Sequence, residues 1–236
     1  MNKIKSGLLV LTALVLSNSM RAQTIEEGKK FMYYERYQSA KTLFQKLIAT
    51  TPTATEAIYW LGMATMSEGE FSPASLAQAK EIYRKALETN ANNPLLIVGM
   101  GSVELHEGKS QDARNRFETA LSLSQNKDLD VLIAVGKANS DFDNKNGDPN
   151  YAIEKSKLAT STKKSKEPVA FVYMGDAYRM LMDGGNAQIS YQSALNIDPN
   201  YARALYRIGK IYQTQGQGQE EIYMKYFNEA IAKDPA

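Results

Sequence analysis

The sequence contains no cysteine and only one histidine, His106, among its 236 residues. The absence of cysteine excludes disulfide bonds, thiolate nucleophiles, thiolate metal ligands and a lipid anchor attached through sulfur. A single histidine excludes a histidine-based metal cluster, and a Ser–His–Asp triad could use only His106. We therefore expect no catalytic residue, no metal ion and no cofactor, and we interpret His106 as a surface or groove residue late in a helix.

Long apolar runs are also scarce, and the clearest one covers residues 7–16. Lys3 and Lys5 precede this run, and small and polar residues follow it up to Ala22. That order is typical of a cleaved signal peptide, and the run is shorter than the ~20 residues that a membrane-spanning helix needs. We predict a signal peptide at 1–22, an exported mature chain that is periplasmic or associated with the outer membrane, and no transmembrane span. Cleavage near Ser19 and cleavage after Ala22 are both compatible with the small residues there.

An excess of charge is missing as well. The chain has 28 basic and 26 acidic residues, and removal of Lys3, Lys5 and Arg21 with residues 1–22 leaves 25 against 26, a net charge of about −1. Such a balance does not indicate a nucleic-acid partner. Asp141–Gly147 has the acidic start of a calcium loop but lacks its later ligands, so we interpret it as a polar loop between helices.

Glycines recur at a nearly constant period. Six of them lie in apolar, helix-like segments and are separated by 34, 39, 35, 39 and 34 residues: Gly28, Gly62, Gly101, Gly136, Gly175 and Gly209. Glycine inside a helix costs about 1 kcal/mol relative to alanine. A repeated cost implies a shared reason, and we expect that a second helix approaches closely at each glycine.

A second pattern follows each glycine, with a small, an aromatic and another small residue at spacings of 4 and 3 in the clearest examples. Ala187, Tyr191 and Ala194 are one such set, and these spacings place them on one helix face. Together with Gly175, Tyr178 and Pro199, they resemble a tetratricopeptide repeat. The last repeat is similar, with Leu205, Gly209, Tyr212, Gly216, Phe227, Ala230 and Pro235. The Ala-Gln exit of the signal peptide resembles exported proteins of Bacteroidetes-type bacteria.

The resemblance implies an all-α, right-handed α-solenoid of about six helix–turn–helix repeats across 23–236. We place the repeats at about 23–54, 55–93, 94–128, 129–167, 168–201 and 202–236. Extra residues predict longer loops near 68–73 and 144–149. The fourth repeat has Ser156 in place of the aromatic residue, and we expect lower local stability there. Since solenoids need polar ends, the end at Ala236 suggests either a longer protein or a last repeat that packs on a partner.

In proteins of the resembled family, the first helix of each repeat lines a concave groove that binds partner peptides or helices. Helical spacing from the repeat glycines predicts an apolar, methionine-rich first half and a charged second half of this groove. The candidate residues are Tyr59, Met63, Met66, Leu105, His106, Lys137, Asp176, Arg179, Arg203, Tyr206 and Lys210. An alternative is that several of them pack against the neighbouring second helix.

These patterns predict a non-catalytic scaffold that binds other proteins, with partners in the periplasm or outer membrane. Two alternatives remain open: a glycan-binding helical-repeat subunit of an outer-membrane uptake system, and an interaction module of a longer protein with a downstream functional domain. Chaperone co-factors of the resembled family bind a C-terminal carboxylate through a clamp of lysine and asparagine residues. This chain does not have those residues at the corresponding positions, and Tyr59, for example, occupies a position where the clamp would have a lysine.

Overall fold

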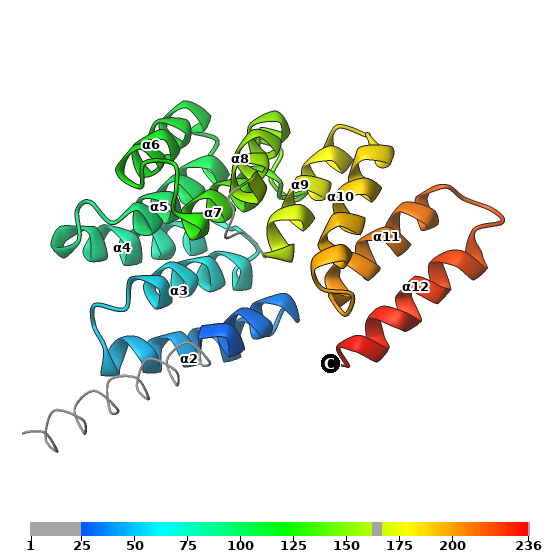
Figure 1. The fold of residues 1–236 in the computed structure, drawn as a ribbon. Helices are drawn as coiled ribbons and strands as arrows, with labels where there is room; N and C mark the ends of the chain where they lie inside the picture. The colour runs from blue at the N-terminus through cyan, green and yellow to red at the C-terminus, as the bar shows by residue number, and fades with distance from the viewer. Residues whose placement is uncertain (1–24, 162–166, 236) are drawn as a thin grey trace, which may run out of the picture. The chain divides into compact units, whose positions relative to one another are not determined.

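A computed structural model describes residues 25–161 and 167–235. The predicted signal peptide lies outside these described residues. Residues 25–33 are helical, and eleven further helices follow in the described part of the chain. They are α2 (Tyr37–Thr50), α3 (Thr55–Glu68), α4 (Pro73–Thr89), α5 (Pro94–His106), α6 (Ser110–Leu123), α7 (Leu129–Asn139), α8 (Pro149–Ser161), α9 (Pro168–Met180), α10 (Gly184–Ile197), α11 (Ala202–Thr214) and α12 (Glu220–Lys233) (Figure 1).

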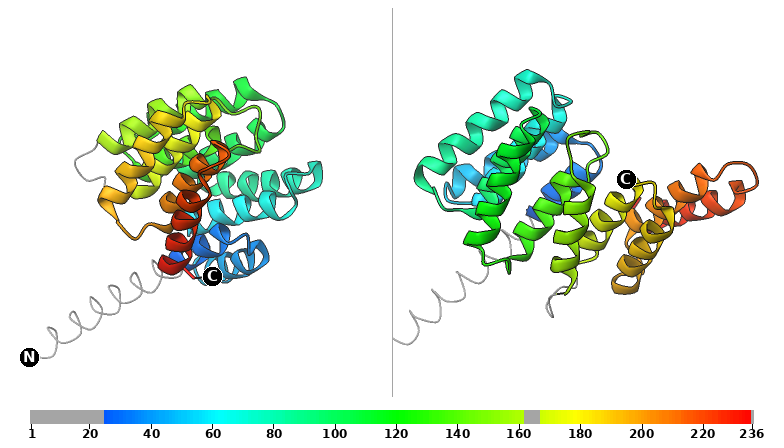
Figure 2. Two further views of the ribbon diagram at one scale, coloured as in Figure 1. Left: turned by 90° about the vertical axis from the view of Figure 1, so that its right-hand side faces the viewer. Right: turned by 90° about the horizontal axis from the view of Figure 1, so that it is seen from above.

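The chain divides into two compact units between Val103 and Glu104, within α5. In the first unit α3 packs on both α2 and α4. In the second unit each helix from α6 to α12 packs on the next, and α7 also packs on α9 (Figure 2). Contacts between sequence neighbours are the defining property of a helical repeat array. The all-α fold with helices packed in pairs is confirmed, while the right-handed course of the whole array and the repeat boundaries stay predictions.

The repeat glycines allow aromatic rings of the following helix to approach the backbone. A Cβ built on Gly28, Gly62 or Gly175 would lie closer than 3.0 Å to the ring of Phe44, Tyr83 or Tyr191, respectively. These three rings are fully buried. Gly209 meets the ring of Phe227 in the same way. The expectation of close helix approach is thus confirmed at these glycines, and Gly99, which the period does not include, also meets the Tyr83 ring.

The fourth repeat is packed differently. A Cβ on Gly136 would approach the hydroxyl oxygen of Ser156 to 2.8 Å, where other repeats place a ring, and would otherwise meet only the Ala152 carbonyl oxygen at 3.9 Å. Tyr151, five residues before Ser156 on the same helix, is buried instead and stacks on Phe117 of α6, with ring centroids 6.5 Å apart. Helix α8 thus has Ser156 at the usual position of the aromatic residue but places the Tyr151 ring in the interior from another position. Lower local stability of this repeat stays a prediction.

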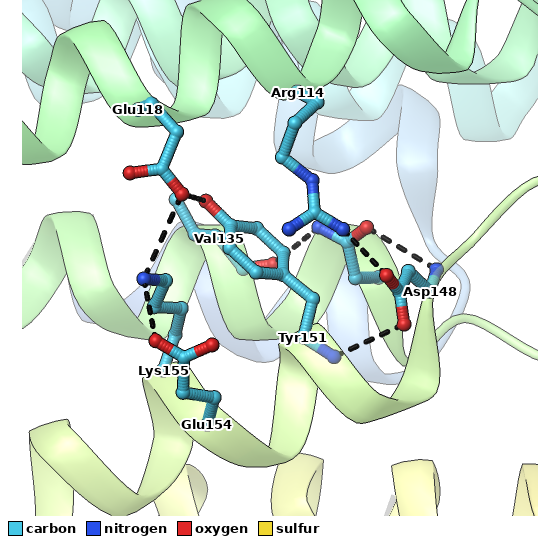
Figure 3. Close-up of polar contacts among 8 residues, drawn as sticks. Arg114, Glu118, Val135, Asp148, Tyr151, Glu154 and Lys155 are labelled. Carbon is cyan, nitrogen blue, oxygen red and sulfur yellow. Dashed lines mark hydrogen bonds and ion pairs between the residues drawn. The ribbon is translucent and has the colours of Figure 1, made fainter.

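Tyr151 is the centre of a polar network that joins α6 to α8 (Figure 3). Its hydroxyl donates a hydrogen bond of 2.8 Å to Glu118, and the Arg114 guanidinium and the Lys155 ammonium lie 3.4 and 4.8 Å from its ring centroid. Arg114 also pairs with Asp148, and Lys155 lies 3.7 Å from Glu118. Burial and the nearby Glu118 carboxylate raise the pKa of Tyr151, so the phenol remains a donor at neutral pH.

Replacing Tyr151 with phenylalanine should lower the free energy of unfolding by about 1–2 kcal/mol, because a hydrogen bond to a charged acceptor is lost while the ring stays. Urea-induced unfolding followed by circular dichroism measures the change. Tyr223→Phe, at a half-buried tyrosine of α12, is the matched control and should change stability by less than about 0.5 kcal/mol. Equal effects of the two substitutions would contradict the role given to the Tyr151 hydroxyl.

Four prolines occupy the first position of a helix: Pro73, Pro94, Pro149 and Pro168. Proline is well tolerated there, because its missing N–H would have no partner within the helix. Gly184 and Gly185 are the first residues of α10, and the Asp183 side chain before them caps the helix by accepting the Asn186 N–H at 3.0 Å.

Candidate protein-binding surface

Asp176 on α9 is a buried carboxylate surrounded by donors, and its side chain is only 3% exposed. The Tyr191 hydroxyl on α10 donates a hydrogen bond of 2.7 Å to its Oδ1 atom. From α11, the Nε atom of Arg207 lies 3.0 Å from Oδ1, and the Nη2 atom of Arg203 lies 3.5 Å from Oδ2. A buried charge needs such partners. The residue therefore ties together three helices of the second unit.

The two arginines are only partly satisfied by Asp176. Arg207 donates one long hydrogen bond of 3.3 Å to Oδ2, while its buried Nε atom, although close to Oδ1, has no aligned hydrogen-bond partner. Arg203 donates at 3.3 Å to the Tyr173 hydroxyl and lies over that ring at 4.7 Å. Both arginine side chains keep about a fifth of their surface exposed, at 22% and 23%.

An exposed aromatic ring adjoins these arginines. Phe142, in the loop between α7 and α8, is 42% exposed. The guanidinium groups of Arg179 and Arg207 lie 4.7 and 5.7 Å from its ring centroid. Sequence reasoning missed Phe142 and Tyr173 as parts of this surface. The extra loop residues at 144–149 were a signal, but nothing in the spacing placed the Phe142 ring beside α9 and α11.

The surface carries more positive than negative charge. Lys137, Arg179, Arg203, Arg207 and Lys210 lie on the first helices α7, α9 and α11, while the acids are Asp176 on α9 and Asp141 and Asp143 on either side of Phe142. Burial alone would lower the pKa of Arg203, but Tyr173 and Asp176 outweigh this effect and raise it, so the group stays charged. We define the arginine surface as Phe142, Tyr173, Asp176, Arg179, Arg203 and Arg207.

His106, the last residue of α5, lies near Lys137 and Asp141 on the second unit. Burial lowers its pKa from 6.5 to about 4, with a further lowering from Lys137 that Asp141 opposes. The imidazole is therefore neutral at pH 7. The loop beside it is held by Asn146, whose side-chain amide donates at 3.1 Å to the Leu105 carbonyl.

Titration of His106 should give a midpoint near pH 4 in the folded protein, and the single histidine makes its ring resonance easy to follow by NMR. As the pH falls, His106 is protonated in the unfolded chain before it is protonated in the folded chain. The contribution of His106 to stability is therefore constant above pH 6.5 and declines as the pH falls from 6.5 toward 4. His106→Gln should remove that part of the pH dependence. A folded-state midpoint near 6.5 would contradict the burial of this ring.

The apolar half of the predicted groove is mostly interior. Tyr59, Met63, Met66 and Leu105 are 0–3% exposed, so they present little side-chain surface. In contrast Tyr206 is 41% exposed and lies beside Phe227 of its own repeat, with ring centroids 5.5 Å apart. Partner binding by any of the predicted groove residues stays a prediction. The structure brings Asp176, Arg179 and Arg203 together, along with Lys137 near His106.

Three other properties of the described residues bear on function: a surface hollow, the placement of possible metal ligands, and the length and apolar character of the helices. The first unit has a shallow hollow of about 470 Å³, whose lining combines Leu61, Ala77 and Ile82 with the polar side chains of Lys41, Gln45, Thr65, Gln78 and Glu81. Within residues 25–161 and 167–235, no group of three or more His, Asp or Glu side chains is placed to hold a metal ion. In the same ranges no helix has the length and apolar character needed to cross a bilayer.

Residues 186–216, which cover most of α10 and all of α11, match the family model described as TPR repeat. A comparison with curated protein sequences gave no match. The chain is similar in structure to human IFIT1, solved as a dimer with PPP-AAAA, with a TM-score of 0.59, 18% identity and coverage of 89% of this chain and 49% of that one.

Two other solved structures are also similar. One is a tetratricopeptide repeat protein from Parabacteroides merdae, with a TM-score of 0.53, 15% identity and coverage of 92% and 80% of the two chains. The other is the APC/C hetero-tetramer Cut9–Hcn1, with a TM-score of 0.54, 18% identity and coverage of 98% and 44%. At these identities the likeness establishes the fold. The fold is an array of helix pairs packed like those of tetratricopeptide repeats, and residues 186–216 match one such repeat.

Proposed function

We propose that this protein is a non-catalytic interaction module that binds a peptide or helix of a partner protein on the arginine surface. The observation that carries the proposal is the cluster of Arg203 and Arg207 at the buried Asp176 carboxylate, next to the exposed Phe142 ring on which Arg179 and Arg207 lie. Arginine and aromatic side chains dominate the energetics of protein interfaces. A tetratricopeptide-type array also presents its first helices as a continuous surface, on which a partner can lie across several repeats.

We further propose that the module acts outside the cytoplasm, in the periplasm or at the outer membrane. The basic start, apolar run and small-residue exit of residues 1–22 support this location. Cell fractionation and intact-mass measurement of the mature protein should find it in the cell envelope, with Gln23 as its first residue. An unprocessed chain in the cytoplasm would contradict the proposal.

Blocking the arginine surface tests the binding function directly. The chain has no cysteine, so Asp143→Cys, next to Phe142 in the exposed loop, can be labelled selectively with polyethylene glycol maleimide. The labelled protein should no longer retain proteins from a cell-envelope extract that the unlabelled variant retains. Ile189→Cys on α10, at a 65% exposed position, is the matched control, and its labelling should leave retention unchanged. Loss of retention only with the control would overturn the assignment of the surface.

A further inference from the structure

The arginine surface has hydrogen-bonding capacity that the protein itself does not use. Each guanidinium offers about five N–H donors, and Asp176 offers two oxygens. One oxygen already accepts from Tyr191, and the two arginines approach the carboxylate at 3.0–3.5 Å, with only one hydrogen bond between them and it. The single negative charge of Asp176 is therefore shared by the two positive charges of Arg203 and Arg207.

Arg179 adds a further positive charge to the same place. Its guanidinium lies over Phe142, on which Arg207 also lies, so the ring connects the two cations. Stacking on a ring leaves the N–H edge of a guanidinium available for a carboxylate. Among the described residues, Asp176 is the only acid within ion-pair distance of these arginines, although Asp141 and Asp143 flank Phe142. The ring beside the arginines gives an apolar contact for the stem of a bound side chain.

Resting on the proposed function, we infer that the partner segment is acidic and that its Asp or Glu carboxylates bind to Arg179, Arg203 and Arg207. Bidentate pairing with carboxylates is the strongest and most directional interaction available to arginine. Asp176 is then a positioning residue: it orients Arg203 and Arg207 and competes with the incoming carboxylate for their donors. Planar guanidinium donors that are partly exposed also suit phosphates, so the test must distinguish an acidic peptide from a nucleic acid.

The test measures binding of fluorescein-labelled dodecapeptides to the full mature chain by fluorescence anisotropy. One peptide alternates Glu with Ala, a second has Gln in place of every Glu, and an oligodeoxyadenylate of the same charge is the third probe. We expect the Glu peptide to bind at least about tenfold more tightly than the Gln peptide and more tightly than the oligonucleotide, with an affinity that falls as salt is added.

Variants assign the binding to the arginine surface. Arg207→Gln and Arg179→Gln should each weaken Glu-peptide binding by about five- to tenfold. Arg84→Gln, at an arginine of α4 whose side chain is 53% exposed, is the matched control and should not change it. Asp176→Asn keeps an acceptor for Tyr191 and removes the competing charge, so it should tighten binding several-fold. Arg179→Gln, which leaves the Asp176 contacts in place, keeps the test decisive should Asp176→Asn fail to fold.

Equal affinity for the Glu and Gln peptides would overturn the acidic partner. Because the maleimide block does not depend on charge, the proposed function would still stand if that block abolished retention of envelope proteins. Tighter binding of the oligonucleotide, lost in Arg179→Gln, would replace the acidic partner by a nucleic acid. If Arg84→Gln weakened binding of the Glu peptide as much as Arg207→Gln does, the assignment of binding to the arginine surface would be contradicted.

Discussion

Replacing Asp176 with alanine should lower the free energy of unfolding by about 3 kcal/mol, because the substitution leaves two arginines and a buried hydroxyl without their shared partner. Tyr191 is fully buried, so its hydroxyl has no water to replace the 2.7 Å hydrogen bond. Arg203 and Arg207 retain about a fifth of their surface, and solvent screening there keeps the loss below that of a fully buried pair.

Urea-induced unfolding of the mature protein measures this loss, and Asp176→Asn is the informative comparison. Asparagine keeps an oxygen that accepts from Tyr191 but removes the charge, so it should cost about 1–2 kcal/mol. A change of less than about 1 kcal/mol in Asp176→Ala would show that the carboxylate is not the structural centre of α9, α10 and α11. Asp176 would then not be what holds Arg203 and Arg207 in place on the arginine surface.

Replacing Gly175 with alanine should lower the free energy of unfolding by about 1–2 kcal/mol. The added Cβ would lie closer than 3.0 Å to three atoms of the Tyr191 ring, which is fully buried and held through its hydroxyl by Asp176. Overpacking of this kind costs about 1–3 kcal/mol and exceeds the gain of about 1 kcal/mol in helix propensity. Urea-induced unfolding measures the result.

Gly136 provides the matched control for this effect, since it occupies the same repeat position but faces Ser156. Gly136→Ala combined with Ser156→Ala removes the 2.8 Å approach to the serine oxygen and keeps the helix propensity of alanine. The double variant should be as stable as the wild type or more stable by up to about 1 kcal/mol. If Gly175→Ala were equally harmless, the ring-against-glycine packing would not explain the glycine period.

The helix pairs were predictable from the sequence because their packing depends on local spacing. Gly28 and Phe44, or Gly175 and Tyr191, recur in register and meet in the structure as expected. What the sequence did not predict comes from contacts between repeats. Tyr151 replaces the missing ring at Ser156 through partners on α6, and no spacing within the fourth repeat indicates those partners.

The candidate site was predictable in part for the same reason. Helical spacing assigned Asp176, Arg179 and Lys210 to the first helices and suggested a charged half of the surface. It did not predict that Asp176 would be buried under Arg203 and Arg207, or that Phe142 would reach α9 and α11 from an inserted loop. Spacing also placed Met63 and Met66 in the groove, whereas burial leaves them almost no exposed surface.

Site-specific photocrosslinking in cells tests the central claim most directly. A benzophenone amino acid in place of Phe142, at the exposed ring of the arginine surface, should give a discrete crosslinked product with a partner protein in the cell envelope. The same group in place of Ile189, which is 65% exposed on α10, should give none. A crosslinked product at Ile189 and none at Phe142 would contradict the arginine surface as the place where this protein binds its partner.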